Sequence, residues 1–480
     1  MTKFFLMVLF IIGPVGLRAT TLHVGIGQAF PDPSSAALTA LPGDTILVHA
    51  GSYQGTFWFE NIHGTESAWI TICGEDESLV LFDGGSESMH FSDCSYVRIC
   101  RITVSGQTGN GMNIDDAGST DTPAHHIEVS EVTFKNMAAS GNNDMLKLSG
   151  LEDFVILQCS FTNGAAGGSG IDMVGCHRGQ ITQCSFQTMG SNAIQAKGGT
   201  QFIRIERNRF ENAGARGINL GGSTGLDFFR PHDAPFEAAD LQVYANFFDG
   251  SQTPLAYVGS VRVDVANNVI RNPGKWVFRI LQETTEPAGR FLECGNNYFR
   301  NNVVLFSPDN RPTVNIGPNT NPESFTVTHN LCYDGSASTT SPFAGYPFQD
   351  PASIIGQDPL LTAECPSPNS PLIAAGISVK GATVDFYGKQ WGIPPSIGAC
   401  ELDNPTGVRV NAVQETTPCC NVAERTPSDL LIYVNESCAP LTVVVYSVLG
   451  QIVFTQKLEG GFTTIHTVGG WYGVHVIPKQ

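Results

Sequence analysis

Lys197 is the residue of this chain whose type and setting are best suited to chemistry. It ends the short alternating segment Ile194–Lys197 and is followed directly by Gly198 and Gly199. A lysine that is desolvated among other cations can lose its proton near neutral pH and then take a proton from a carbon next to a carboxylate. The reaction also needs a cation, either a basic side chain or calcium, to stabilise the charge that develops. The alternative is that Lys197 only caps a turn.

Polar side chains form two columns when the strands around Lys197 are aligned by their inward Ile, Leu and Met residues. The first column contains Asn113, Lys147, Asp172, Gln195 and Asn219, and the second contains Asp115, Ser149, Val174, Lys197 and Gly221. Because side chains alternate between the two faces of a strand, residues at equivalent places lie on one face. The sequence therefore predicts a polar strip along which an extended ligand can bind.

Basic residues gather near this strip although the chain as a whole is acidic. Lys and Arg number 26 against 44 Asp and Glu, which gives a formal net charge of −18. This balance argues against nucleic-acid binding, which needs a basic footprint. Residues 171–230 nevertheless hold more basic than acidic groups, which predicts local attraction of an anionic ligand. Arg204, Arg207 and Arg209 could equally lie on a solvated face without binding anything.

The strands that position these residues belong to a repeated unit. The phrases ILQCSF (156–161) and ITQCSF (181–186) are nearly identical, and similar segments end at Phe134, Phe210, Phe248, Ile270, Phe299 and Cys332. Short repeats without helical periodicity predict a parallel β-solenoid, in which each coil buries its inward face only against its neighbours. Since parallel crossovers are right-handed in about 98% of cases, we expect a right-handed β-helix. An antiparallel sandwich is the alternative, and it would need hairpin turns between adjacent strands.

An asparagine ladder is a second mark of the same fold. The residues two places before the repeat ends are Val132, Cys159, Cys184, Asn208, Asn246, Asn268, Asn297 and Asn330. An asparagine amide can accept a hydrogen bond from one coil and donate one to the next. We interpret Cys159 and Cys184 in this column as small apolar core residues.

The domain organisation follows from the two ends of the chain. Residues 1–19 have the charged start, apolar run and small cleavage residue of a signal peptide, and the apolar run is too short to span a bilayer. A β-helix is expected over residues 20–403, with a short helix in Ala36–Leu41 covering its open first coil. A linker is predicted over 404–428. Residues 429–480 alternate strands and turns and predict a small, β-sandwich-like C-terminal domain.

The phrases at both ends of the predicted solenoid resemble those of secreted right-handed β-helix proteins, including pectate-lyase-like and chondroitinase-B-like polysaccharide lyases. They are Pro42–Tyr53, Ser370–Gly376 and Ser396–Glu401. The resemblance implies an all-β fold over about residues 20–403. The phrase QAKGGT (195–200) resembles the lysine-bearing strand of the chondroitinase-B-like lyases, which implies that Lys197 is the catalytic base. That family places an arginine on the next coil where this chain has Gly221; Arg216, Arg230 or Arg279 could substitute for it, and Arg279 is the expected second catalytic residue. The calcium ligands of that family are not matched, because Gln195 and Val174 stand in their places.

The same resemblance implies a polysaccharide partner, an anionic glycan that contains uronate and is cleaved by β-elimination, with calcium as the one cofactor to consider. A non-catalytic protein that binds glycan or mediates adhesion is the alternative. A hydrolase is less well supported, because it would need a pair of suitably spaced catalytic carboxylates. A monomer is expected. The side chains expected to bind substrate come from the columns and from later loops: Lys147, Asp172, Asn219, Arg216, Phe229, Arg230, His232 and Glu283.

The C-terminal segment resembles the sorting domains of the type IX secretion pathway. The resemblance lies in Val445–Gln451 and Gly469–Val476. It implies interaction with secretion machinery and a protein that is secreted or attached to the outer cell surface. An ordinary immunoglobulin-like appendage is the alternative.

Overall fold

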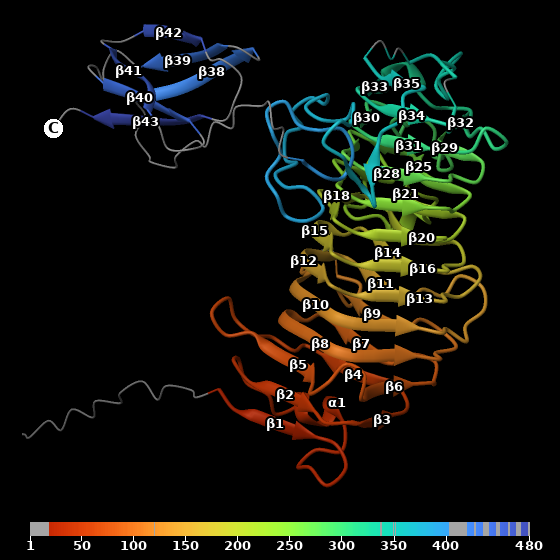
Figure 1. Ribbon diagram of the computed structural model, residues 1–480. Coiled ribbons are helices and arrows are strands. Elements are labelled where there is room, and N and C mark those ends of the chain that lie inside the picture. Colours follow the sequence, from red (N-terminus) through yellow and green to blue (C-terminus); the bar gives the residue numbers. More distant parts are fainter. Residues whose placement is uncertain are drawn as a thin grey trace, which may run out of the picture.

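The computed structural model describes residues 19–119, 121–336, 338–348, 350 and 352–402, together with six strands between residues 420 and 478. The predicted signal peptide lies outside the described residues except for Ala19, and so does most of the predicted linker. Parallel strands follow one another in stacked coils from the N-terminal end (red) towards the C-terminal end (green) of the main body (Figure 1). A parallel β-helix is therefore confirmed, and the antiparallel sandwich is wrong for this part of the chain.

One face of the β-helix is a sheet of ten described strands, which we call the site sheet. Each of its strands pairs in parallel with its counterpart on the next coil. Its strands are β4 (Phe57–Glu60), β7 (Met89–Ser92), β9 (Met112–Asp115), β11 (Leu146–Ser149), β14 (Ser169–Val174), β17 (Asn192–Lys197), β21 (Arg216–Gly221), β25 (Thr253–Val258), β29 (Trp276–Leu281) and β32 (Thr313–Ile316).

The remaining faces of the coils form a second, larger sheet of 25 described strands. They are β1 (Thr21–Val24), β2 (Thr45–Val48), β3 (Gly51–Tyr53), β5 (Ile70–Gly74), β6 (Val80–Asp83), β8 (Ser95–Ser105), β10 (Ala124–Lys135), β12 (Leu151–Leu157), β13 (Ser160–Thr162), β15 (His177–Thr182), β16 (Ser185–Gln187), β18 (Thr200–Gln201), β19 (Arg204–Glu206), β20 (Arg209–Glu211), β22 (Ala238–Ala239), β23 (Gln242–Tyr244), β24 (Phe247–Asp249), β26 (Ser260–Val261), β27 (Asp264–Ala266), β28 (Val269–Arg271), β30 (Tyr298–Arg300), β31 (Val303–Leu305), β33 (Thr326–Thr328), β34 (Leu331–Tyr333) and β35 (Ile354–Ile355).

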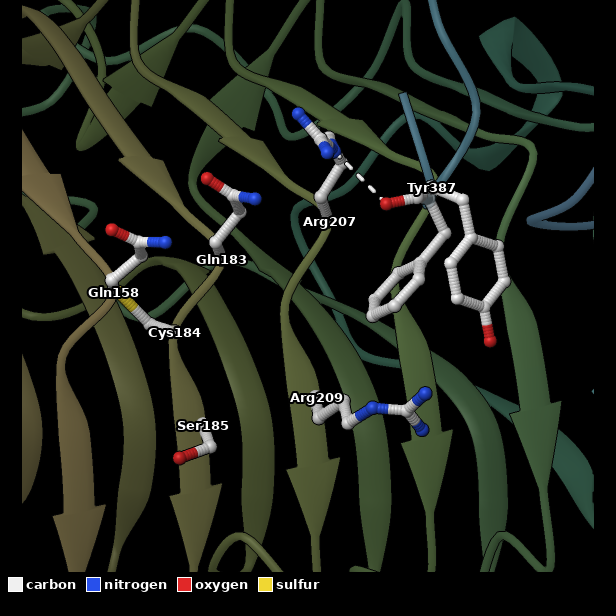
Figure 2. A pocket seen from close by; sticks show the side chains of 8 residues that line it. Gln158, Gln183, Cys184, Ser185, Arg207, Arg209 and Tyr387 are labelled. Atoms are coloured by element: carbon white, nitrogen blue, oxygen red, sulfur yellow. Dashed lines mark hydrogen bonds between the residues drawn. The ribbon is translucent and has the colours of Figure 1, made fainter. Parts of the chain in front are cut away.

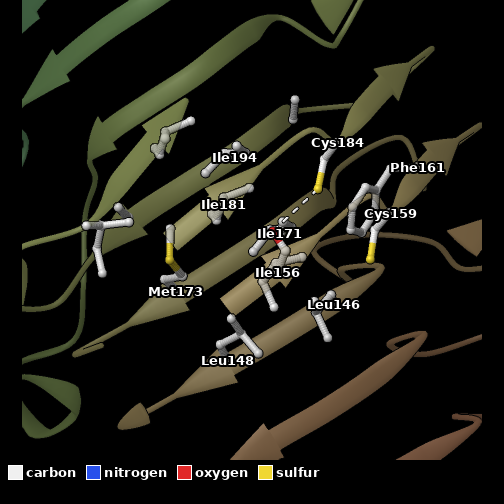
Figure 3. Packing of buried hydrophobic residues seen from close by; sticks show 14 of the residues in the cluster. Leu146, Leu148, Ile156, Cys159, Phe161, Ile171, Met173, Ile181, Cys184 and Ile194 are labelled. Atoms are coloured by element: carbon white, nitrogen blue, oxygen red, sulfur yellow. Dashed lines mark hydrogen bonds between the residues drawn. The ribbon is translucent and has the colours of Figure 1, made fainter. Parts of the chain in front are cut away.

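The core consists of equivalent inward residues stacked coil upon coil. Leu146, Ile171 and Ile194 lie in one such row, opposite Ile156 and Ile181 from the larger sheet (Figure 3). A row of phenylalanine rings runs beside them with centroids 4.5–5.0 Å apart and nearly parallel planes: Phe134, Phe161, Phe186, Phe210 and Phe248. Each coil therefore buries its apolar face on identical groups above and below, which fixes the register of every strand.

The asparagine ladder is present, with one correction. Asn208, Asn246, Asn268, Asn302 and Asn330 are fully buried, and each side-chain oxygen accepts from the backbone of the preceding coil. The prediction that Asn297 belongs to the ladder is wrong, because Ile270 pairs with Val304 and not with Phe299. Asn297 instead bonds Val263 and Ser260 at a different turn. The predicted interpretation of Cys159 and Cys184 as buried core thiols is confirmed.

A short helix covers the N-terminal coil. Helix α1 (Pro33–Ala37) begins after Asp32, whose side chain accepts a hydrogen bond from the backbone N–H of Ser35 at 2.8 Å. It packs on β1, β2 and β4, as expected, although it starts and ends earlier than the predicted segment. Among the described residues no helix is long and apolar enough to cross a membrane.

The C-terminal strands form two antiparallel sheets of three described strands each. One contains β38 (Cys420–Thr426), β39 (Asp429–Val434) and β42 (Gly461–His466), and the other contains β40 (Leu441–Ser447), β41 (Ile452–Leu458) and β43 (Tyr472–Pro478). Strand β38 falls inside the predicted linker 404–428, so the antiparallel region begins before residue 429.

Replacing one rung of the ladder is expected to destabilise the β-helix strongly. Asn246→Ala would leave the buried backbone N–H of Asn208 without its acceptor, remove one of the two acceptors of the Asn208 amide and remove the side-chain donor to the carbonyl of Ile205. A single buried group left unsatisfied costs about 1–3 kcal/mol, so we expect a clear fall in the thermal midpoint. Calorimetry checks this, with the exposed Asn310→Ala as control. An Asn246→Ala midpoint equal to that of the control would contradict the ladder's role.

Candidate functional site

The two predicted polar columns lie side by side on the outward face of the site sheet. Strand register aligns Asn113, Lys147, Asp172, Gln195 and Asn219 in the first. This column continues through Ala256 to Arg279 and Asn315. Asp115, Ser149, Val174 and Lys197 align in the second. Successive rungs are about 4.8 Å apart, so neighbouring side chains in a column touch.

Two lysines converge on one buried carboxylate at the centre of this face. Asp172 is only 1% exposed, and its Oδ2 contacts Lys147 Nζ and lies 3.3 Å from Lys197 Nζ. A second carboxylate, that of Asp144, lies 3.6 Å from Lys147 Nζ and is also 1% exposed. The side chain of Lys197 is 12% exposed and that of Lys147 is 23% exposed, so both lysines remain partly accessible from solvent. The structure thus brings together the predicted residues Lys147, Asp172 and Lys197.

The charges in this lysine cluster act on one another. Burial together with the negative charge of Asp172 raises the pKa of Asp144 to about 6, against the opposing effect of Lys147. Burial disfavours the charged form of Lys147, but the carboxylates of Asp172 and Asp144 outweigh it and raise the pKa of that lysine. Lys147 is therefore a fixed cation. Asp144 is therefore a carboxyl that exchanges its proton close to neutral pH.

A second group of cations lies one to three coils further along. Arg216 donates to Asn219 Oδ1 at 2.9 Å and lies 3.1 Å from a carboxylate oxygen of Glu283. Arg279 donates to Asn315 at 2.9 Å, and its guanidinium lies 4.5 Å from the centre of the Trp276 ring. Burial lowers the pKa of Arg279, as does repulsion by the charge of Arg216, while Glu283 acts in the opposite direction. An anion placed between them would relieve that repulsion.

Asn219 has a different role from the one expected. It is buried, its amide oxygen accepts from Arg216, and its amide nitrogen donates to the carbonyl of Gly221 at 3.1 Å. All its contacts are internal, so it orients Arg216 and is not free to bind a ligand itself. The predicted residues Arg216, Asn219 and Glu283 thus form one connected group, and Arg279 lies two coils further along the column of Asn219.

The insertion after β21 folds back as a wall beside Lys197. Glu237, fully buried at its base, accepts from the backbone N–H groups of Gly198 and Thr224, both at 2.9 Å, and from the hydroxyl of Thr284. Gly222 lies so close that an added Cβ would come within 3.2 Å of the Lys197 side chain. The insertion therefore borders the lysine cluster and restricts where Lys197 can point.

A buried ion pair ties this insertion to a coil far back in the sequence. Arg230 donates to both carboxylate oxygens of Asp116, at 2.5 and 2.9 Å, and Asp116 is buried. The chain passes over Gly150 and Gly175, both at positive φ, where a Cβ would collide with Arg230 or its partner. Arg230 was expected to bind substrate. Its guanidinium instead forms an ion pair with Asp116, and this pair fixes the insertion against the β-helix.

The other two predicted residues of the insertion, Phe229 and His232, differ in burial. Phe229 is 0% exposed and packs against Ala234, Phe236 and Phe291, so the expectation that its ring stacks on a sugar is wrong. The neighbouring Phe228 is the exposed ring. His232 is exposed, and only its backbone carbonyl is engaged, by Arg290. Neither Phe229 nor His232 joins the lysine cluster.

Sequence reasoning missed a charged group at the N-terminal end of the same face. His90 hydrogen-bonds Asp115 at 2.7 Å and Glu87 at 3.1 Å, and the half-exposed ring of Trp58 stacks on it at 4.2 Å. Burial opposes protonation, but the two carboxylates raise the pKa of His90 to about 9. Asp144 was missed as well. It lies before its strand, outside the alternation that revealed the columns.

Comparison with known proteins supports the fold. A family model described as a right handed beta helix region matches residues 82–231. The fold is the right-handed parallel β-helix. No curated protein matches the chain significantly.

Three solved structures illustrate the likeness. The chain is 15% identical to pectate lyase Pel9A, covering 80% of this chain and 97% of that one with a TM-score of 0.50. It is 18% identical to an alginate lyase from Paenibacillus sp. str. FPU-7, over 70% of this chain and 97% of that one, with a TM-score of 0.41. The A-module of Azotobacter vinelandii mannuronan C-5 epimerase AlgE6 is 13% identical, over 68% and 93%, with a TM-score of 0.47. At such identities the likeness concerns the fold.

The residues of the lysine cluster do not fit calcium. Calcium takes six to eight oxygen ligands. Here the buried oxygens of Asp144 and Asp172 already face ammonium groups, and the described residues contain no group of three or more His, Cys, Asp or Glu side chains able to hold a metal ion.

The raised pKa of Asp144 predicts a specific pH dependence of stability. An unfolded Asp has a pKa near 3.9, so between about pH 4 and 6 the folded state binds more protons and its stability falls as the pH rises. Asp144→Asn keeps an acceptor for the Ser169 N–H and should remove this fall, shifting the thermal midpoint by a few degrees relative to wild type.

Thermal unfolding from pH 4 to 7 makes the comparison. Asp153→Asn is the matched control, because a hydrogen bond and charge from Arg178 lower the pKa of Asp153. Its contribution has the opposite sign, being present above pH 4 and lost as the pH falls. Parallel pH profiles for wild type and Asp144→Asn would show that Asp144 is ionised throughout this range.

Proposed function

We propose that this protein binds an anionic polysaccharide along the site sheet and cleaves it by β-elimination at uronate residues, with Lys197 as the base. The observation that carries the proposal is the set of four cations, Lys147, Lys197, Arg216 and Arg279, on one outward face between β11 and β29. They outnumber the carboxylates of Asp144, Asp172 and Glu283 that accompany them.

The two cationic groups have separable roles in this proposal. Arg216 and Arg279 repel each other, so a sugar carboxylate that enters between them gains charge-assisted hydrogen bonds and relieves the repulsion. Neutralising that carboxylate acidifies the adjacent C–H bond, because the developing negative charge is delocalised onto the carboxylate. Lys147 and Asp172 set the position of Lys197, whose side chain stays partly exposed.

The elimination step balances without any further reactant. Lys197 in its neutral form takes the proton from the carbon next to the carboxylate. The electron pair left behind forms a carbon–carbon double bond, and the bond to the glycosidic oxygen breaks. That oxygen leaves with a proton from the Lys197 ammonium or from water. The products are one new reducing end and one unsaturated uronate.

A second candidate function is glycan binding without catalysis. The observation that favours it is the 3.3 Å contact between Lys197 Nζ and the buried Asp172 carboxylate. A lysine held in such an ion pair serves well as a fixed cation, whereas a base must first give its proton away. The same face would then hold an acidic glycan through Arg216 and Arg279 and release it unchanged.

Ultraviolet absorbance of unsaturated uronate decides between the two. With pectate, alginate or chondroitin as substrate, we expect an absorbance increase that Lys197→Ala reduces by about 10²-fold or more, as for loss of a general base. Lys135→Ala, on β10 away from the site sheet, should leave the rate unchanged. EDTA should also leave the rate unchanged, because the cluster does not fit calcium.

Each other result assigns the function differently. Elimination that survives Lys197→Ala would remove Lys197 as the base while keeping the reaction. No absorbance with any of these polymers, together with retention of the protein on the same immobilised polymers, would establish the binding protein. Loss of activity in EDTA would contradict the assignment of Arg216 and Arg279, and not calcium, as the groups that neutralise the sugar carboxylate.

We also propose that the protein is exported and that residues 429–480 direct it to the secretion machinery and the outer cell surface. The apolar run Phe4–Ile12 after Lys3, with Ala19 before Thr20, supports a cleaved leader. We expect N-terminal sequencing of protein recovered outside the cell to begin at Thr20. Protein that retains Met1 and stays inside the cell would contradict export.

A further inference from the structure

A pocket of about 430 Å³ lies away from the site sheet, against the larger sheet. It lies beside the segment around Phe386, and its walls include Gln158, Gln183, Arg207 and Tyr387 (Figure 2). Phe386 packs on Phe247 with ring centres 4.7 Å apart, which anchors that segment to the β-helix. The pocket therefore lies between the turn that carries Arg207 and the packed segment around Phe386.

Arg207 is the distinctive group of this corner. Among the seven basic residues of segment 171–230, it is the one for which the described structure shows no carboxylate within 4 Å. The other six are paired: Arg178 with Asp153, Lys197 with Asp172, Arg204 with Glu206, Arg209 with Glu364, Arg216 with Glu283 and Arg230 with Asp116. Arg207 Nε donates to the carbonyl of Phe386 at 2.9 Å, which fixes the guanidinium at the pocket wall (Figure 2).

Two side-chain amides extend the polar wall from Arg207. Gln158 and Gln183 occupy the same turn position on the two preceding coils, directly after the paired residues Leu157, Thr182 and Glu206. All three turn residues have φ between +53° and +60°, so their side chains project outward in one row about 4.8 Å apart. Both glutamines are exposed, and within the described structure their amides have no hydrogen-bond partner.

An aromatic surface faces the end of that row. The Tyr387 side chain is 62% exposed at the pocket, on the side of Arg209, with which it interacts. Arg209 lies between the rings of Phe247 and Phe386, at 5.0 and 4.8 Å, and is paired with Glu364, so it forms part of the wall. A fixed cation, two free amides and an exposed ring together match a saccharide that carries a carboxylate: the guanidinium binds the carboxylate, the amides bind hydroxyls and the ring stacks on a sugar face.

We propose that this pocket, lined by Gln158, Gln183, Arg207 and Tyr387, is a second binding site for an acidic polysaccharide, separate from the site sheet and without catalytic groups. It goes beyond the function proposed for the site sheet, because it requires no reaction there. A chain held at this site would keep the protein on its polymer.

Affinity electrophoresis of the full-length protein in gels that contain polygalacturonate or alginate tests the proposal. Arg279→Ala serves as the background, because it weakens binding at the site sheet. In that background Arg207→Asn and Gln183→Asn should each weaken the dissociation constant at least fivefold for one of the two polymers. Asparagine tolerates the positive φ of both turns, so the substitutions leave the fold intact. Arg207→Lys should weaken binding less than Arg207→Asn does.

Controls separate this site from general charge effects. Lys380→Ala removes one positive charge from an exposed position in the segment that follows β35, and it should not change retention. Tyr387→Ala should weaken it, since the ring is exposed and is not a core group. Gels containing dextran should retain none of the variants.

Three results would overturn the proposal. The first is retention of Arg207→Asn and Gln183→Asn equal to that of the Arg279→Ala background. The second is retention in dextran gels equal to that in acidic polysaccharide gels. The third is binding to poly-glutamate as tight as to the polysaccharide, which would make an acidic peptide the ligand. The outcome is independent of catalysis. Absence of elimination products with retention lost in Arg207→Asn would overturn the lyase and keep this site.

Discussion

Stacking of identical positions on successive coils is the constraint on which the rest of the structure depends. No coil has a core of its own, and its inward residues are buried only because equivalent residues lie above and below. The phenylalanine row and the asparagine ladder are two expressions of this constraint, one apolar and one polar. Both demand one register over many coils. The outward side chains inherit that register, and this is why residues from distant parts of the sequence meet on one face.

The same constraint explains how much could be predicted from the sequence. The columns through Lys147, Asp172 and Asn219 were found by aligning inward Ile, Leu and Met residues, and the structure keeps that alignment. The prediction of the ladder was wrong at Asn297, because the coil that follows Asn268 contains an extra segment and the equivalent turn residue is Asn302. A repeat-based alignment holds while coil lengths are equal and loses its place where an insertion changes the count.

Residues in insertions lie outside the repeat, and for them the sequence carried no positional information. Phe229 and Arg230 were assigned to ligand binding by their type alone. The structure places Phe229 in a small core beneath the insertion and pairs Arg230 with Asp116, more than one hundred positions earlier. A buried carboxylate needs a partner, and the chain supplies one from a loop that crosses several coils. Nothing in the local sequence shows which distant carboxylate that is.

Charge on a solenoid face follows its own rule, and that rule indicates where anions can bind. Side chains in one column touch, so like charges on adjacent coils repel and opposite charges attract. The column through Lys147 and Asp172 obeys this rule by changing sign from one coil to the next, and neutral Gln195, Asn219 and Ala256 then separate it from Arg279. Most basic groups of the central coils are consumed by such pairing. Among the described residues of these coils, Arg279 and Arg207 form no ion pair. Burial and the charge of Arg216 lower the pKa of Arg279, and Arg207 is fixed in the same row as two uncharged amides. An unpaired cation is disfavoured in a structure that pairs its charges so consistently, and an external carboxylate removes that disadvantage at both places. Binding of an acidic polymer at each of them thus follows from the same stacking that builds the core.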